Sequence, residues 1–232
     1  MLRARVAQDV AARRLTRERA VASVVALLDT GAIRVGNECY VRDNGSYGAT
    51  TLRNRHARIE GRVLRLRFRG KSGKMRELVC NDTAMVRCVR RMQDLPGQHL
   101  FQYVEDDGEI TPVGSDDVNA YLRETMGEEF TARNFRTWTA SVLGFELLVT
   151  KPDGALGTIL SAVAERLGNT PAIARKSYIH PAIIAAAGDA DLAAKLLPAA
   201  LPRRTQWLSR EERGLIAFLH RTEPGVRLDR VG

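Results

Sequence analysis

The sequence predicts a mainly helical protein of the α+β class, a helical domain with one small antiparallel sheet. Apolar residues recur at helical spacing over most of the 232 residues, whereas a single segment, residues 57–80, alternates with period two between turn signals. Hydrophobic residues make up 44% of the chain and charged residues 27%, as in an ordinary globular protein.

The N-terminal part is expected to be helical. Residues 3–14 have an amphipathic pattern, and Thr16 is placed to cap a second helix. The buried face of that second helix should carry Val21, Val24, Val25 and Leu28. Residues 43–46 follow as a turn, because Asp, Asn, Gly and Ser cluster there.

Residues 57–80 are expected to form a three-stranded antiparallel meander. Its turns should lie at residues 60–61 and 70–73. In the middle strand, Leu64, Leu66 and Phe68 alternate with arginines, so one face is apolar and the other is cationic. This pattern fits a basic ribbon that carries Lys71 at its tip, and it also fits an ordinary amphipathic surface ribbon.

The remainder is expected to consist of helices separated by polar and glycine-containing breaks. Asn81 or Asp82 should cap one helix, Ser115 a second, and Thr131 a longer third. On that third helix, Arg136 falls outside the apolar stripe, which consists of Phe135, Trp138, Val142, Phe145 and Val149. A loop is expected at residues 151–154, followed by a helix that stops at Gly168. A short helix should then start at residues 170–171. A capping box at residues 209–212 should begin a last helix near residues 210–220.

Charge is distributed unevenly along the chain. Lys and Arg exceed Asp and Glu by 18 − 6 = 12 over residues 1–76 and by 14 − 9 = 5 over residues 131–232, whereas residues 77–130 have an excess of acids, 12 − 4 = 8. Two basic regions that flank an acidic one favour a polyanionic partner, most often a nucleic acid. A solvated, arginine-rich surface would produce the same numbers.

Five residues together suit phosphoryl transfer from DNA to a tyrosine. Tyr178 is the candidate nucleophile, and Lys71 is the candidate general acid for the departing 5′ oxygen. Arg34 and Arg136 are candidate clamps for the nonbridging oxygens, with Asn169 as a neutral third donor. Taken singly, each arginine could be a surface residue and Tyr178 a structural one.

No metal or cofactor site is expected. The histidines at 56, 99, 180 and 220 have no metal-ligand spacing, and neither do the three cysteines at 39, 80 and 88. We expect reduced thiols in a cytoplasmic, nucleoid-associated protein, because no signal peptide or long apolar span is evident.

The chain resembles the catalytic domain of type IB DNA topoisomerases, in the bacterial branch related to the poxvirus enzymes, over about residues 3–190. The resemblance depends on the order and combination of seven stretches: IRVGNECY (33–40), GATTLRNRH (48–56), FRGKSGK (68–74), LFQY (100–103), SDDVNAYL (115–122), FRTW (135–138) and GNTPAIARKSY (168–178).

The resemblance implies that Arg34, Lys71, Arg136 and Tyr178 hold the family's catalytic roles. Asn169 falls where many members have histidine, and a neutral donor is expected to preserve activity. Residues 191–232 would form a C-terminal helical extension, and the family's β-rich N-terminal clamp domain is not expected within these 232 residues. Further DNA contacts are expected from Arg53, Arg55, Arg65, Arg67, Arg69, Lys74, Arg133, Arg175 and Lys176.

The function expected from this resemblance is relaxation of supercoiled DNA through a transient 3′-phosphotyrosyl bond, by a monomer that needs neither ATP nor a metal. Two alternatives stay open. A tyrosine recombinase shares the fold and the constellation, although recombinases usually have His-x-x-Arg where residues 133–136 here begin with Arg133. A noncatalytic DNA-binding module would carry Tyr178 as a structural residue.

Overall fold

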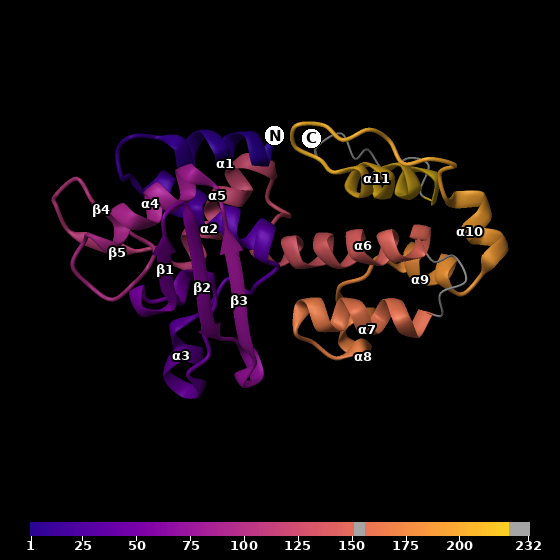
Figure 1. Cartoon of the computed structure of the whole chain (residues 1–232), viewed down its shortest axis with the longest axis horizontal. Coiled ribbons are helices and arrows are strands. Elements are labelled where there is room, and N and C mark those ends of the chain that lie inside the picture. Colours follow the sequence, from indigo (N-terminus) through magenta and orange to yellow (C-terminus); the bar gives the residue numbers. More distant parts are fainter. Residues whose placement is uncertain (151–155, 223–232) are drawn as a thin grey trace. The chain divides into compact units, whose positions relative to one another are not determined.

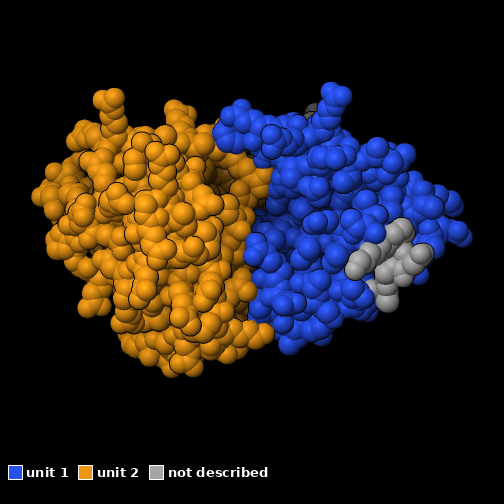
Figure 2. Space-filling model, viewed as in Figure 1, with its two compact units in different colours: residues 1, 134–232 blue, residues 2–133 orange. Residues whose placement is uncertain are grey.

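The structure is a computed structural model that describes residues 1–150 and 156–222. The chain divides into two compact units, which Figure 2 colours separately. We call residues 2–133 the N-terminal unit and residues 134–232, with Met1, the C-terminal unit. The sequence pattern does not predict this boundary, and the loop predicted at residues 151–154 lies outside the described residues.

The core of the N-terminal unit is built on α2 (Arg17–Gly31), which packs against α1 (Leu2–Ala11), α4 (Thr83–Gln93) and α5 (Ser115–Met126). Thr16 caps α2 as predicted, because its side chain accepts a hydrogen bond from the Arg19 backbone N–H. The predicted face of α2 is buried, and each of its four apolar residues is at most 2% exposed. Burial of this face orders the helices around it.

The predicted meander is confirmed, with strands β1 (Ala57–Glu60), β2 (Val63–Arg69) and β3 (Met75–Cys80) in the order β1-β2-β3 (Figure 1). Both pairings are antiparallel, and the register places Arg67 opposite Glu77. The apolar set of β2 is buried, at 1–2% exposure, while the three arginines between them are exposed. Period two therefore separates a core face from a charged face, as the sequence predicts.

Three details of the N-terminal unit differ from the expectations. A two-stranded sheet, β4 (Gln102–Val104) with β5 (Ile110–Pro112), was not predicted, because strands of three residues carry too little periodicity to be recognised. The cap of α5 is Gly114 and not Ser115, which is already the first helical residue. Residues 43–46 end a short helix, α3 (Glu38–Asn44), at Gly45 in the left-handed conformation.

Over its described residues, the regular secondary structure of the C-terminal unit is helical, and residues 197–209 form an irregular connection. It contains most of α6 (Ala132–Thr150), then α7 (Leu156–Leu167), α8 (Pro171–Ser177), α9 (Pro181–Ala187), α10 (Ala190–Leu196) and α11 (Arg210–Thr222) (Figure 1). The predicted stop at Gly168 and the predicted start at Thr170 and Pro171 are both present. Among the described residues, no helix is both long and apolar enough to cross a membrane.

Helix α11 packs on α6, and a hydrogen bond and an aromatic pair join the two helices. The Trp138 indole N–H donates to Glu212 Oε1 at 2.8 Å, and the Phe145 and Phe218 rings lie 5.5 Å apart. Glu212 also completes the predicted capping box, since its Oε2 accepts from the Ser209 backbone N–H at 2.8 Å. One nearly buried carboxylate thus joins the C-terminal segment to α6.

We predict that Glu212→Ala lowers the free energy of unfolding by about 2 kcal/mol, because two donors lose the acceptor that satisfies them. Urea denaturation of the full chain measures the change. The matched control is Glu146→Ala, which removes an exposed carboxylate from α6. Equal stabilities of the two variants would contradict this role for Glu212.

Candidate catalytic residues and DNA interface

Arg136 is the most deeply buried of the candidate catalytic residues, at 3% exposure. The prediction that it lies off the buried face of α6 is therefore wrong. Its side chain Nη2 donates to the carbonyl of Leu167, the last residue of α7, at 3.0 Å. A cation at this position also interacts favourably with the C-terminal end of the α7 dipole.

Asn169 is positioned by the end of α7. Gly168 adopts φ +65°, and the Asn169 backbone N–H then bonds back to the Ala164 carbonyl at 2.8 Å while the Gly168 N–H bonds to Glu165. This is a Schellman-type ending, which glycine permits because it has no Cβ. Asn169 consequently follows by two residues the carbonyl that Arg136 binds.

Tyr178 ends α8 and is half-buried. The Arg136 guanidinium carbon lies 5.0 Å from the centre of its ring, within the range of a cation–π contact. The backbone N–H groups of Tyr178 and Ile179 both bond to the Ala174 carbonyl at 3.1 Å. The C-terminal unit thus brings Arg136, Asn169 and Tyr178 together around the ends of α7 and α8.

Arg34 and Lys71 belong to the N-terminal unit. The backbone of Arg34 is fixed by a hydrogen bond from the Ala49 N–H to the Arg34 carbonyl at 2.9 Å. Gly36, at φ +103°, and Gly48 allow the two chain segments to approach closely, since a Cβ on Gly48 would lie 2.5 Å from Gly36. This close approach sets the path of the chain on which the Arg34 side chain stands.

Lys71 is exposed at the tip of the β2–β3 connection, as predicted. The Gly70 N–H bonds to the Lys74 carbonyl at 2.8 Å and closes the turn, while Ser72 and Gly73 adopt positive φ values of 60° and 72°. The Arg69 guanidinium lies against Gly73, where an added Cβ would be 3.1 Å from its Nη2. The turn therefore presents a dense positive charge around Lys71.

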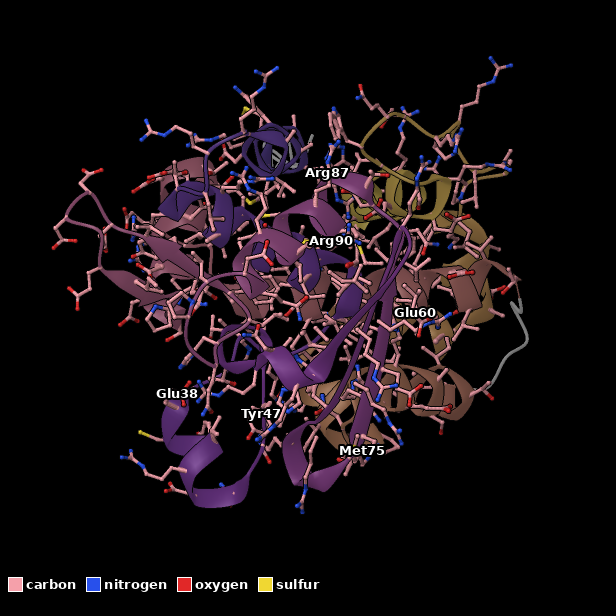
Figure 3. The ribbon with its side chains drawn as sticks, turned by 60° about the vertical axis from the view of Figure 1, so that its left-hand side comes forward. Glu38, Tyr47, Glu60, Met75, Arg87 and Arg90 are labelled. Atoms are coloured by element: carbon pink, nitrogen blue, oxygen red, sulfur yellow. The ribbon has the colours of Figure 1, made fainter. Side chains whose placement is uncertain are left out.

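Two of the predicted DNA-binding arginines, Arg53 and Arg55, have side-chain partners on α3 or just after it. Arg53 donates to Glu38 at 2.8 Å, and Arg55 donates to the Tyr47 hydroxyl at 2.7 Å (Figure 3 labels Glu38 and Tyr47). The ring of His56 packs edge-on to Tyr47 at 4.4 Å. Burial, with the nearby positive charges of Arg55 and Arg53, lowers the pKa of His56 below its ordinary value.

The exposed face of the three-stranded sheet carries the predicted arginine stripe, but carboxylates offset part of its charge. Arg65 pairs with Glu60 at 3.2 Å and Arg67 with Glu77 at 3.1 Å. Both pairs are well exposed, so each is weak and can exchange for a phosphate. The remaining predicted contacts, Lys74, Arg133, Arg175 and Lys176, are all exposed.

Three residues that contact the predicted site residues, or the backbone next to them, were not themselves predicted. Glu38 and Tyr47 were missed because their pairing with Arg53 and Arg55 depends on how distant segments fold together. Ser141, on α6, contacts the backbone on both sides of Ile179. The signal available in the sequence was a serine within the predicted helix, five residues after Arg136.

The structure is thus a mainly helical protein in which a buried arginine, Arg136, contacts the ring of Tyr178. The chain matches the family described as eukaryotic DNA topoisomerase I, catalytic core, over residues 1–186, and it belongs to that family. The match includes all five candidate catalytic residues and ends before α10 and α11.

Two curated relatives agree with this assignment. The chain is 33% identical to DNA topoisomerase 1B of Acanthamoeba polyphaga mimivirus over 162 residues, which cover 63% of this chain and 48% of that protein. It is 29% identical to DNA topoisomerase 1 of Mycosarcoma maydis over 143 residues, covering 54% of this chain and 14% of the fungal protein. The chain thus spans about half the length of the viral relative and a much smaller part of the fungal one.

Among solved structures, the chain is similar to the XerH site-specific recombinase bound to a palindromic difH substrate in a post-cleavage complex. The TM-score is 0.47 at 15% identity, over 77% of this chain and 47% of that one.

We predict that Gly48→Ala lowers the free energy of unfolding by about 1–3 kcal/mol, because its Cβ would force apart the backbones of the two segments that hold Arg34. The control is Gly157→Ala, since a Cβ there meets open space. Thermal unfolding measures both variants. A Gly48→Ala chain as stable as the control would show that the close approach does not constrain this loop.

Proposed function

We propose that this chain binds duplex DNA and relaxes supercoils by cutting one strand through a 3′-phosphotyrosyl intermediate, followed by religation. The observation that carries the proposal is the Arg136 guanidinium, buried beside the Tyr178 ring and held by the end of α7. A cation at this place can contact the phosphate that the tyrosine attacks. Family membership and the two topoisomerase relatives support the same activity.

In the proposed reaction, the Tyr178 hydroxyl gives its proton to solvent water, its oxygen attacks the phosphorus, and a new P–O bond forms to the tyrosine. The bond to the 5′ oxygen breaks, and Lys71 donates a proton to that leaving oxygen. Arg34, Arg136 and Asn169 donate hydrogen bonds to the nonbridging oxygens, where negative charge develops. Religation is the reverse displacement, so the phosphotyrosine conserves the bond energy without ATP, and the arginines supply the positive charge without a metal.

The DNA contact is proposed to involve the exposed cations of both units. Arg69, Lys71 and Lys74 concentrate charge at the β2–β3 turn, while Arg65, Arg67 and Arg53 must exchange a carboxylate for a phosphate. We infer that the chain acts as a monomer on cytoplasmic, nucleoid DNA. We also infer that it belongs to the bacterial and poxvirus-like branch, on the strength of the seven stretches quoted above.

Incubation of the full chain with supercoiled plasmid in EDTA tests the proposal as a whole. Relaxed topoisomers without strand exchange are expected. Recombinant products in place of relaxation would favour a tyrosine recombinase, and DNA binding without any covalent adduct would favour a noncatalytic module.

Tyr178→Phe is predicted to keep DNA affinity and to abolish the covalent adduct, because only the attacking oxygen is removed. A denaturing gel detects the adduct and a binding titration measures affinity. The control is Tyr103→Phe, which removes a hydroxyl from a buried tyrosine of β4. Adduct formation by Tyr178→Phe would place the nucleophile elsewhere.

Lys71→Ala is predicted to slow cleavage by about 10²–10⁴-fold with little change in DNA affinity, as expected when a general acid is lost. A substrate with a 5′-bridging sulfur should largely restore the rate, because a thiolate leaves without protonation. Lys195→Ala, which removes an exposed lysine of α10, is the control. If sulfur does not accelerate cleavage by Lys71→Ala, then Lys71 is not the acid.

A further inference from the structure

Ser141 is a buried hydroxyl on α6 that contacts the main chain of the proposed nucleophile. It is 4% exposed and lies five residues after Arg136. Its Oγ is 3.5 Å from the Tyr178 carbonyl oxygen, to which it donates, and 3.1 Å from the His180 backbone nitrogen, from which it accepts. The hydroxyl therefore bridges the two peptide groups on either side of Ile179.

These two peptide groups lie where the chain leaves α8 and enters α9. Tyr178 has φ −134° and ψ −42° and ends α8, and His180 caps α9. Backbone polar groups at helix ends need partners from outside the helix, and Ser141 supplies one to each. Ile179, 4% exposed, anchors the segment between them.

The neighbours of Ser141 indicate that packing alone does not require a hydroxyl at this position. Ala140 is 1% exposed, and a Cβ on Gly144 would lie 3.4–3.7 Å from Ile183, Ile159 and Ile179. Small apolar residues already allow α6 to approach this segment, so alanine would satisfy the packing at position 141. Burying a hydroxyl is costly unless it forms hydrogen bonds, and this one forms two to the same short segment.

We propose that Ser141 is a positioning residue for Tyr178, holding the backbone from which the phenol projects. This inference rests on the proposed function, in which the Tyr178 oxygen attacks phosphorus. Side-chain direction follows from backbone conformation, so a shift of the Tyr178 peptide moves the attacking oxygen. Arg136 contacts the ring and Ser141 the main chain, so α6 fixes both ends of the same residue.

Ser141→Ala is expected to slow single-turnover cleavage by about 10–100-fold, since a displacement on the order of 1 Å at a reacting atom costs about that much. Affinity for DNA should be unchanged, because Ser141 is buried. A 5′-bridging sulfur should not restore the rate, because the defect lies in nucleophile placement and not in leaving-group protonation. Lys71→Ala, which sulfur should restore, provides the contrast in the same assay.

The matched control is Ser23→Ala, which removes a 0% exposed hydroxyl from α2 that donates to the Arg19 carbonyl at 2.9 Å. It should lose a similar amount of stability without slowing cleavage, when both variants are assayed well below their unfolding midpoints. A cleavage rate for Ser141→Ala equal to that of the unmodified chain would overturn this inference alone. A slow rate that the 5′-bridging sulfur restores would do the same. Failure of the unmodified chain to form any adduct would overturn the proposed function and this inference together.

Discussion

The burial of one cation, Arg136, sets the arrangement of the C-terminal unit. A guanidinium at 3% exposure requires compensation, because an isolated charge is strongly disfavoured away from water. The Leu167 carbonyl supplies a hydrogen-bond acceptor and the Tyr178 ring supplies a π face. Both partners lie at helix ends, since Leu167 is the last residue of α7 and Tyr178 is the C-cap of α8, so one side chain contacts the ends of both helices.

In the N-terminal unit, many arginines lie close together and repel one another. Carboxylates lie between the arginines on the exposed face of the sheet and beside Arg53, and they reduce repulsion before any polyanion arrives. At the β2–β3 turn, Arg69, Lys71 and Lys74 stand close together instead. A partner rich in phosphate would be attracted most strongly to this turn, where the proposed acid is located.

The sequence predicted the elements that repeat a clear period, such as the buried face of α2 and the meander of residues 57–80. It also predicted the capping box at Glu212, which is a local motif. It did not predict the short strands β4 and β5, which are too brief to show periodicity. The burial of Arg136 was missed because hydropathy assigns arginine to the surface, whereas the end of α7 provides its acceptor. Ser141 was missed for a similar reason, since its two partners are backbone groups about 40 residues away.

Identification of the residue that becomes covalently joined to DNA tests most directly whether Tyr178 is the nucleophile. The full chain would be trapped on a cleavable duplex in EDTA, digested with nuclease and protease, and analysed by peptide mass spectrometry. The expected product is a nucleotide linked through its 3′-phosphate to Tyr178, beside Arg136. A nucleotide on any of the other four tyrosines, or an adduct that forms only when a divalent metal is supplied, would contradict it.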